Sequence, residues 1–297
     1  MPSPAPASRD ADFPIVETFG YPHDSTSPAA QTAWSNKACP FAESPCEKYR
    51  QYHYGYCSVS YAAEADGGVR QTYAVCDHRL DGDPLRLVVE DHFKKGEPVR
   101  LVPEVVLSEP RTSFDYVAVS VQGNSITDQI VIETQSIDIR GGGVGPAWKA
   151  WEQGKPDRWR EYFTDEAKQK GRKDTVAYGV NMANIYKRLG LQVGEKGAFL
   201  KRIGVPLYIV MQDRPFQYLR RRIPFQAAQP GKDWDITFMT FDYSGKKVKG
   251  GQLEFCHVQT VRTTVGFYAA ALAAGSRPPA NDKAHFLERV KRKAGLA

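Results

Sequence analysis

The chain has 297 residues, of which 41% are hydrophobic and 25% are charged, an ordinary composition for a globular protein. A chain of this length can bury a full core without disulfides, and no stretch approaches the length of an apolar membrane helix, so a membrane-spanning helix is excluded. The 40 Lys and Arg residues exceed the 34 Asp and Glu residues, giving a net charge of +6. This excess is compatible with a nucleic-acid partner but does not by itself indicate one.

The first 30 residues are rich in Pro, Ala, Ser and Asp and contain few apolar positions. Such a composition is typical of an arm that is ordered only where it lies on the rest of the protein or on a partner. The N-terminus has neither the basic nor the apolar segment of a secretory signal. We therefore expect residues 1–30 to form the N-terminal arm of a cytoplasmic protein.

Residues 31–84 contain four of the five cysteines. The cysteines are separated by 6, 10 and 18 residues, without the CxxC pairs of zinc fingers. Four thiolates can still form a tetrahedral site for zinc or iron, and the alternative is that all four are buried free thiols. Pro40 and Pro45 interrupt a weak helix over 31–48, so we expect a small lobe with little helix. The candidate metal ligands are Cys39, Cys46, Cys57 and Cys76, and Cys256 lies apart in a predicted strand.

From residue 85 the pattern changes to strands and helices. Residues 85–96 suit a strand or a short helix, and residues 99–108 suit a strand with a proline at its edge. Two β-branched runs, at 113–121 and 129–140, flank the turn-like sequence QGNSITD. They predict a strand–turn–strand pair with acidic residues near one end.

Three residues on this pair form the pattern Asp…Glu-x-Gln. Asp115 opens one strand, and Glu133 and Gln135 lie two apart on the next, so they share a face. A hairpin can bring Asp115 and Glu133 together, and two carboxylates make an oxygen-rich site suited to Mg²⁺. Bound Mg²⁺ activates water and stabilises charge on a phosphate. Nucleases often have lysine at the third position, whereas a glutamine positions water without carrying a positive charge.

The pattern alone is weak, because an Asp in a turn and a Glu paired with an Arg also explain it. Asp128 and Asp138 flank the same strand and are alternative carboxylates. Strand alternation disfavours Asp138, which is an odd number of residues from Glu133.

The next elements predict an α/β arrangement. Residues 146–173 suit short helices and loops, and the apolar spacing over 174–203 predicts a helix with Asp174 as its N-cap. The continuous apolar run at 205–211 predicts a strand buried on both faces. The remaining predicted elements are strands over 233–247 and 252–265 and a basic helix over 283–295.

A cluster of arginines follows the buried strand in the sequence QDRPFQYLRRRIPFQ. Arginine suits bidentate contact with guanine and with phosphate, and the interleaved Gln and Asp suit adenine and cytosine. The alternative is an ordinary solvated helix end. The candidate DNA-binding residues are Gln212, Asp213, Arg214, Arg220, Arg221 and Arg222.

Taken together, these segments resemble type II restriction endonucleases of the NotI/EagI type. The resemblance spans roughly residues 31–225 and rests on several stretches in the same order. These are ACPFAESPCEK, GYCSV and a later cysteine, FDYVAVS, VIETQSID, GVNMANIYKRL and PLYIVMQDRPFQYL.

The resemblance implies an α/β fold of the PD-(D/E)xK nuclease class, a mixed central sheet flanked by helices, with a small N-terminal Cys₄ lobe. It implies that Asp115, Glu133 and Gln135 are catalytic and that Asp115 and Glu133 hold Mg²⁺. The four cysteines of the lobe would hold iron, or zinc in its place, in a structural role. The domains would be the arm (1–30), the lobe (31–84) and a nuclease domain (85–297). The sequence departs from the motif at Phe114, where a proline is expected.

For function, the resemblance implies cleavage of double-stranded DNA at a GC-rich palindrome containing GGCC, with four-base 5′ overhangs. The short chain favours a six-base site such as CGGCCG over an eight-base site such as GCGGCCGC. A palindrome matches a homodimer, because each subunit presents the same surface to one half-site. Such an enzyme would act in the prokaryotic cytoplasm beside a cognate DNA methyltransferase, without a stable complex. The alternatives are a non-catalytic, metal-stabilised DNA-binding regulator and a structure-selective repair nuclease.

Overall fold

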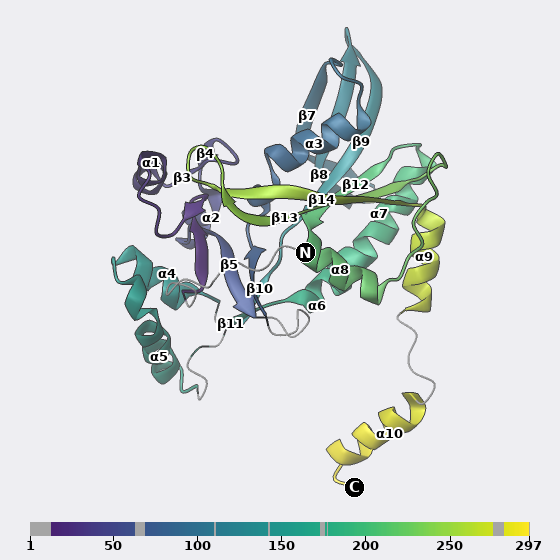
Figure 1. Ribbon diagram of the computed structural model, residues 1–297. Helices are drawn as coiled ribbons and strands as arrows, with labels where there is room; N and C mark the ends of the chain where they lie inside the picture. The colour runs from purple at the N-terminus through teal and green to yellow at the C-terminus, as the bar shows by residue number, and fades with distance from the viewer. Residues whose placement is uncertain are drawn as a thin grey trace.

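The computed structural model describes residues 13–62, 69–109, 111–141, 143–172, 176, 178–275 and 282–296. It is a mixed α/β structure around a central sheet with helices on both faces, as the sequence predicts (Figure 1). Of the helices in these ranges, none combines the length and hydropathy that a bilayer span requires. The strands of the central sheet are β7 (Val99–Ser108), β8 (Arg111–Gln122), β9 (Ser125–Gln135), β12 (Leu207–Gln212), β13 (Ile236–Lys247) and β14 (Leu253–Thr263).

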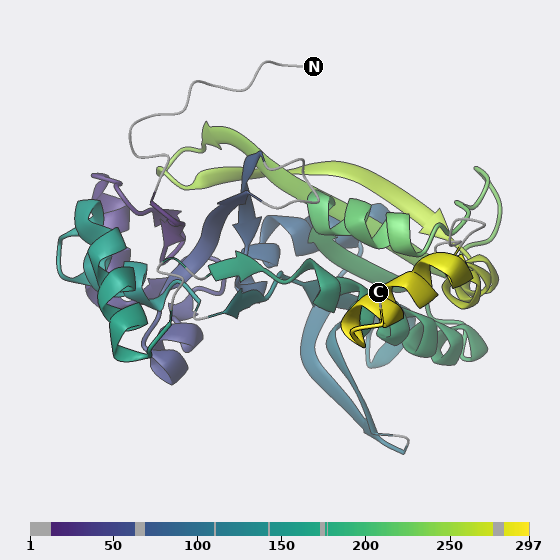
Figure 2. The same ribbon diagram turned by 90° about the horizontal axis from the view of Figure 1, so that it is seen from below.

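The central sheet has the order β14-β13-β12-β9-β8-β7. The strands β7, β8 and β9 form an antiparallel meander whose far end projects from the molecule (Figure 2). The strand β12 runs parallel to both β9 and β13, and β14 returns antiparallel to β13. The sheet is therefore mixed, and β9 is the strand at which its antiparallel and parallel parts meet.

Separate apolar cores lie on the two faces of the central sheet, and β12 contributes to both. Leu207, Ile209 and Met211 belong to one core, whereas Tyr208 and Val210 belong to the other. Every residue of this strand is buried, so the continuous apolar run is confirmed as a strand buried on both faces. One face is covered by α3 (Asp83–His92), and the other by η4 (Ile185–Leu189), α7 (Gly190–Arg202), α8 (Asp213–Arg222) and α9 (Val265–Ala274).

The N-terminal part of the chain forms a second sheet with the order β2-β1-β5-β6. Two of its strands come from the described part of the predicted arm, where Ile15 and Phe19 are buried. Residues 1–12 of the predicted arm lie outside the described residues. The elements here are β1 (Ile15–Thr18), β2 (Tyr21–Pro22), α1 (Pro28–Asn36), β3 (Ala38–Cys39), β4 (Ser44–Pro45), α2 (Glu47–Tyr52), β5 (Tyr56–Ala62), β6 (Arg70–Ala74) and η2 (Asp77–Leu80).

A later segment completes this N-terminal lobe. The helices α4 (Gly145–Glu152) and α5 (Trp159–Gln169) pack beside it, joined by the short η3 (Pro156–Arg158) (Figure 1). Trp148 is buried, with its ring 5.7 Å from that of Phe19. The predicted boundary at residue 84 falls inside α3, and one apolar core connects the lobe to the central sheet.

The helix predicted over 174–203 begins later than the apolar spacing suggests. A short strand, β11 (Tyr178–Val180), pairs with β10 (Ile139–Gly141) before the chain becomes helical at α6 (Met182–Asn184). The proposed N-cap, Asp174, lies outside the described residues. Spacing cannot separate a three-residue strand from the first turn of a helix, because the pairing partner lies elsewhere in the chain. The basic terminal helix is confirmed as α10 (Asp282–Lys293).

Candidate active site

The hairpin of β8 and β9 brings the two predicted carboxylates together. Tyr116 pairs with Ile132, and Asp115 and Glu133 are the next residues beyond this last pair on the two strands. The Asp115 carboxylate accepts hydrogen bonds from the backbone N of Thr134 at 2.9 Å and from its hydroxyl at 3.3 Å. The two-residue period of the strands and the turn between them therefore bring Asp115 and Glu133 together, as the Asp…Glu-x-Gln pattern predicts.

The two carboxylates line a cavity of about 660 Å³ together with Gln135. The Gln135 side chain donates a hydrogen bond to the Ser136 carbonyl at 2.6 Å. Asp138 lines the same cavity, contrary to the prediction from alternation, because β9 ends at Gln135 and alternation stops there. Further lining residues are Asp77, His78, Asp81, Arg188 and Lys196, while Asp128 bonds His92 at 3.0 Å away from the cavity.

Burial and mutual repulsion perturb both carboxyl groups. Burial and the neighbouring charge of Asp115 raise the pKa of Glu133 to about 7, against an opposing effect of Lys196. Burial likewise raises the pKa of Asp115, and the nearby Asp77 raises it further. Oxygen Oε1 of Glu133 is buried without a hydrogen-bond partner among the described residues. Two crowded carboxylates, one with an unused buried oxygen, fit a divalent cation that prefers oxygen ligands.

These shifts predict a pH-dependent stability in the absence of divalent metal. Folding raises the Glu133 pKa from 4.5 to about 7, so the folded state binds the Glu133 proton more tightly than the unfolded state. This proton stabilises the folded protein fully below pH 4.5, and its contribution is lost as the pH rises through 7. At 1.4 kcal/mol per pKa unit, the loss is on the order of 3 kcal/mol. Urea unfolding in a chelator at pH 4.5 and pH 8 measures it. We expect Glu133→Gln to remove the part of the loss that is due to Glu133, and Glu195→Gln, a substitution of an exposed residue on α7, to retain the whole loss.

Two parts of the cavity were not predicted from the sequence. Lys196 on α7 donates to Oε2 of Glu133 at 2.6 Å, although it lies 63 residues away in the chain. Asp77 and His78 come from η2, where Asp77 accepts a hydrogen bond from the Ser136 backbone N at 3.1 Å. The acidic stretch DHRLDGD, which directly follows the fourth cysteine, is the available sequence signal for η2. Nothing in local spacing indicates Lys196.

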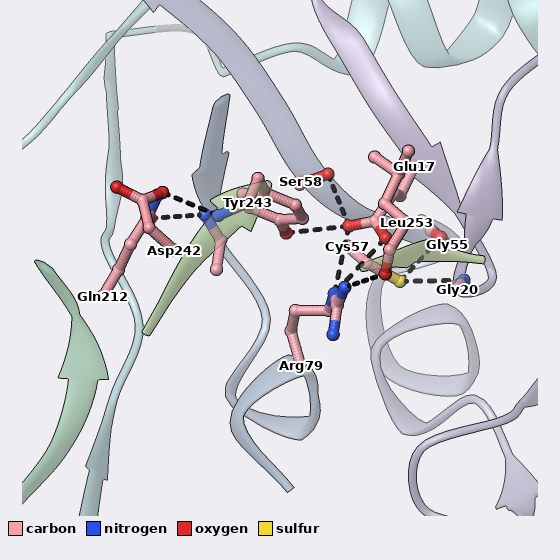
Figure 3. Close-up of polar contacts among 11 residues, drawn as sticks. Glu17, Gly20, Gly55, Cys57, Ser58, Arg79, Gln212, Asp242, Tyr243 and Leu253 are labelled. Atoms are coloured by element: carbon pink, nitrogen blue, oxygen red, sulfur yellow. Dashed lines mark hydrogen bonds and ion pairs between the residues drawn. The ribbon is translucent and has the colours of Figure 1, made fainter. Parts of the chain in front are cut away.

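A buried polar network holds η2 in place (Figure 3). The Glu17 carboxylate accepts hydrogen bonds from Ser58 at 2.7 Å and Tyr243 at 2.8 Å, and forms an ion pair with Arg79 at 3.3 Å. Arg79 also donates to the Leu253 carbonyl at 2.7 Å. The network therefore joins the N-terminal sheet and the β13–β14 hairpin to the turn that carries Asp77 into the cavity.

The cysteines of the lobe lie close enough to one another to interact electrostatically. Burial raises the pKa of the Cys57 thiol well above its ordinary value, and the neighbouring Cys76 and Cys39 raise it further. Burial also raises the pKa of Cys39, with Cys46 adding to the shift, while backbone N–H groups of Ala42 and Phe41 bonded to its sulfur oppose it. The Cys57 sulfur accepts a hydrogen bond from the Gly20 N at 3.2 Å (Figure 3). The same sulfur donates to the Gly55 carbonyl at 3.8 Å.

The four cysteines are not a preformed metal site in this structure. Within the described ranges, no three His, Cys, Asp or Glu side chains are arranged around a common position for a metal ion. Lys48 lies beside the cysteines and donates to the carbonyls of Tyr56 and Val75, each at 3.1 Å. Burial lowers its pKa, and negative charge on Cys76, Cys57 and Cys46 would raise it. The buried ammonium group of Lys48 is therefore placed to balance negative charge on the cysteine sulfurs.

The predicted DNA-binding residues have two different environments. Gln212 is 2% exposed, and its amide bonds Thr72, Ala74 and Asp242, so it links the two sheets. Asp213 accepts hydrogen bonds from Thr240 and Gln259 within the protein. On α8, Arg221 and Arg222 are exposed, Arg220 packs against Phe216 and Phe225, and Arg214 pairs with Asp242 at 3.5 Å. None of these six residues lines the carboxylate cavity.

We compared the chain with protein families and with curated proteins. No protein-family model matches the chain, and no curated protein matches it.

Proposed function

We propose that the protein is a Mg²⁺-dependent, site-specific DNA endonuclease of the type II restriction kind. One observation supports this function most directly. Asp115 on β8 and Glu133 on the neighbouring β9 line one acidic cavity, and a buried oxygen of Glu133 has no hydrogen-bond partner among the described residues. In this proposal both carboxylates hold the metal, and Gln135 orients the attacking water.

The architecture is consistent with the PD-(D/E)xK fold that the resemblance implies. The central sheet is mixed and has helices on both faces. Asp115 lies on β8. Glu133 and Gln135 lie at the end of the adjacent β9, where that strand pairs with the parallel strand β12. Phe114 occupies the position of the motif proline and is buried, so it contributes packing to the same corner of the site.

The residues of the site suit hydrolysis of a phosphodiester. Bound Mg²⁺ supplies a Lewis acid that stabilises charge on the phosphate and on the leaving oxygen. Asp115 and Glu133 fix its position, and the Gln135 amide offers both a donor and an acceptor to a water molecule in the cavity. Asp115 is itself held by Thr134, which limits its rotation. The water oxygen bonds to phosphorus as the bond to the 3′ oxygen breaks.

We assign DNA contact to the exposed side of α8. Arg221 and Arg222 project to solvent, and Arg220 is partly exposed beside them. Arginine can read guanine O6 and N7 or bind phosphate, and each bidentate pair contributes about 1–3 kcal/mol of discrimination. Gln212 and Asp213, with their hydrogen bonds inside the protein, support the start of α8. A homodimer would present this surface twice, which matches a GC-rich palindrome containing GGCC.

We further propose that Cys39, Cys46, Cys57 and Cys76 hold one structural iron or zinc ion. Their proximity to one another, the backbone N–H groups aimed at their sulfurs, and the buried Lys48 ammonium support this assignment. Cys76 directly precedes η2, so a metal there would fix the segment that places Asp77 in the cavity. The metal would have no part in the hydrolysis, which requires no electron transfer.

Metal analysis of the purified protein tests this site. We expect one equivalent of iron or zinc in the wild type and in Cys256→Ser, and none in Cys46→Ser. A metal ion present at a thousand times its dissociation constant stabilises the folded protein by about 4 kcal/mol, so loss of the ion lowers the free energy of unfolding by that amount. A wild type that contains neither iron nor zinc would show that the sulfurs are ordinary buried thiols.

Incubation with unmethylated genomic DNA and Mg²⁺, followed by sequencing of the fragment ends, tests the proposed function. We expect discrete ends at one GC-rich palindrome with four-base 5′ overhangs. Ends at many unrelated sequences or at branched substrates would favour a structure-selective repair nuclease. Intact DNA, together with specific retention of one sequence, would favour a non-catalytic regulator.

A further inference from the structure

Lys196 places a positive charge directly on the proposed metal ligands. Its ammonium group is 2.6 Å from Oε2 of Glu133, and the two side chains are 15% and 11% exposed. The same charge acts on the pKa of Asp115, and Lys196 lines the cavity that contains Gln135. Lys196 thus contacts Glu133 and lies in the same cavity as Asp115 and Gln135.

The packing of α7 holds this lysine in position. A Cβ atom on the adjacent Gly197 would lie 3.1 Å from a side-chain carbon of Ile236, so the glycine lets the helix approach the sheet closely. The Lys196 ammonium also lies 5.5 Å from the centre of the Phe114 ring, which stacks on Phe199. Phe114, at the position of the motif proline, therefore helps to hold the lysine over the carboxylates.

The other cations that line the cavity pair with carboxylates other than the two proposed metal ligands. Arg188 is 65% exposed and pairs with Asp138 at 3.6 Å, and His78 bonds Asp81 at 2.6 Å. Gln135 is neutral, and its amide nitrogen is bonded to a backbone carbonyl. Among the described lining residues, Lys196 is the cation that contacts a proposed Mg²⁺ ligand.

Building on the proposed function, we propose that Lys196 is a catalytic residue whose ammonium group contacts the scissile phosphate and supplies the positive charge that Gln135 lacks. The water oxygen bonds to phosphorus while the bond to the 3′ oxygen breaks. One water proton passes to solvent, and the 3′ oxygen takes up a proton from solvent. Lys196 keeps its own proton and donates hydrogen bonds to a phosphate oxygen on which negative charge develops.

The test compares Lys196→Met and Lys196→Arg with Lys196→Met/Gln135→Lys, which returns a lysine to the motif position. Lys201→Met is the matched control, because Lys201 lies on the same helix and pairs with Asp235 at 2.9 Å outside the cavity. Cleavage of cognate DNA is measured with Mg²⁺, and DNA binding with Ca²⁺. Calorimetry with Mn²⁺ and no DNA gives a readout that is independent of activity.

We expect Lys196→Met to cut on the order of 10²-fold more slowly than wild type, the effect of removing one transition-state donor. DNA binding and Mn²⁺ affinity should not fall, because Glu133 loses only a competing ion pair. Lys196→Arg should retain most of the activity, the double variant should recover at least about tenfold, and Lys201→Met should match wild type.

Three outcomes would overturn the inference. Unchanged cutting by Lys196→Met would show that the charge is not used. Parallel loss of cutting and of Mn²⁺ binding would show that Lys196 only holds Glu133 in place, as would failure of Gln135→Lys to restore activity in folded protein. A wild type that cuts no DNA overturns the proposed function itself, whereas cutting by both wild type and Lys196→Met overturns this inference alone.

Discussion

Glu133→Gln should lose DNA cleavage by on the order of 10³-fold, equivalent to about 4 kcal/mol of transition-state stabilisation. The substitution keeps the shape of the side chain but removes the negative charge that would hold Mg²⁺ opposite Asp115. DNA binding should stay within about a factor of three of wild type, because the arginines of α8 lie outside the cavity. Single-turnover cleavage with Mg²⁺ and gel-shift binding with Ca²⁺ measure the two effects.

Asp128→Asn is the matched control for this prediction. Asp128 lies on the same strand as Glu133 but pairs with His92 at 3.0 Å, away from the cavity. It should cut at the wild-type rate. Equal activity of Glu133→Gln and wild type would contradict the assignment of Glu133 as a metal ligand, and equal inactivity of all three proteins would favour a non-catalytic DNA-binding protein.

Arg79→Met should lower the free energy of unfolding by about 3–5 kcal/mol, the usual effect of removing one partner from a buried ion pair. The substitution leaves the Glu17 carboxylate, which is 0% exposed, without its countercharge. It also removes the hydrogen bond to the Leu253 carbonyl and the packing of the guanidinium between the rings of Phe41 and Phe255. Urea unfolding at neutral pH measures the change.

Arg86→Met provides the comparison, since Arg86 forms exposed ion pairs with Asp83 and Glu90. Exposed pairs contribute about 0–1 kcal/mol, so this variant should be close to wild type. Adding Glu17→Gln to Arg79→Met should recover part of the lost stability, because the buried charge is then removed. An Arg79→Met variant as stable as Arg86→Met would show that the network in Figure 3 contributes little to stability.

The local sequence was sufficient to predict the pair of carboxylates. Asp115 and Glu133 occur on β-branched runs that flank a short turn, and the two-residue period of a strand sets which side chains share a face. The buried strand β12 was predictable for a similar reason, because a short continuous apolar run suits a strand covered on both faces. These features depend on residues that are close together in the chain.

Features that depend on contacts between distant segments required the tertiary structure. Residues 1–30 were predicted to be an arm, yet in its described part Ile15 and Phe19 are buried, and β1 pairs there with β5 from a segment about 40 residues away. Asp138 was placed on the wrong face because the strand ends before it. Gln212 was predicted to read bases, but its amide links two sheets.

The residues of the cavity show most clearly which features follow from local sequence and which depend on contacts between distant segments. The sequence by itself determined that two carboxylates and a glutamine would meet on a hairpin, because the register of a hairpin is a local property. Only the tertiary structure decided that Lys196 from α7 and Asp77 from η2 would face them. The reason is that close helix packing at Gly197 and a buried ion pair at Arg79 fix those two segments, and such contacts join residues far apart in the chain.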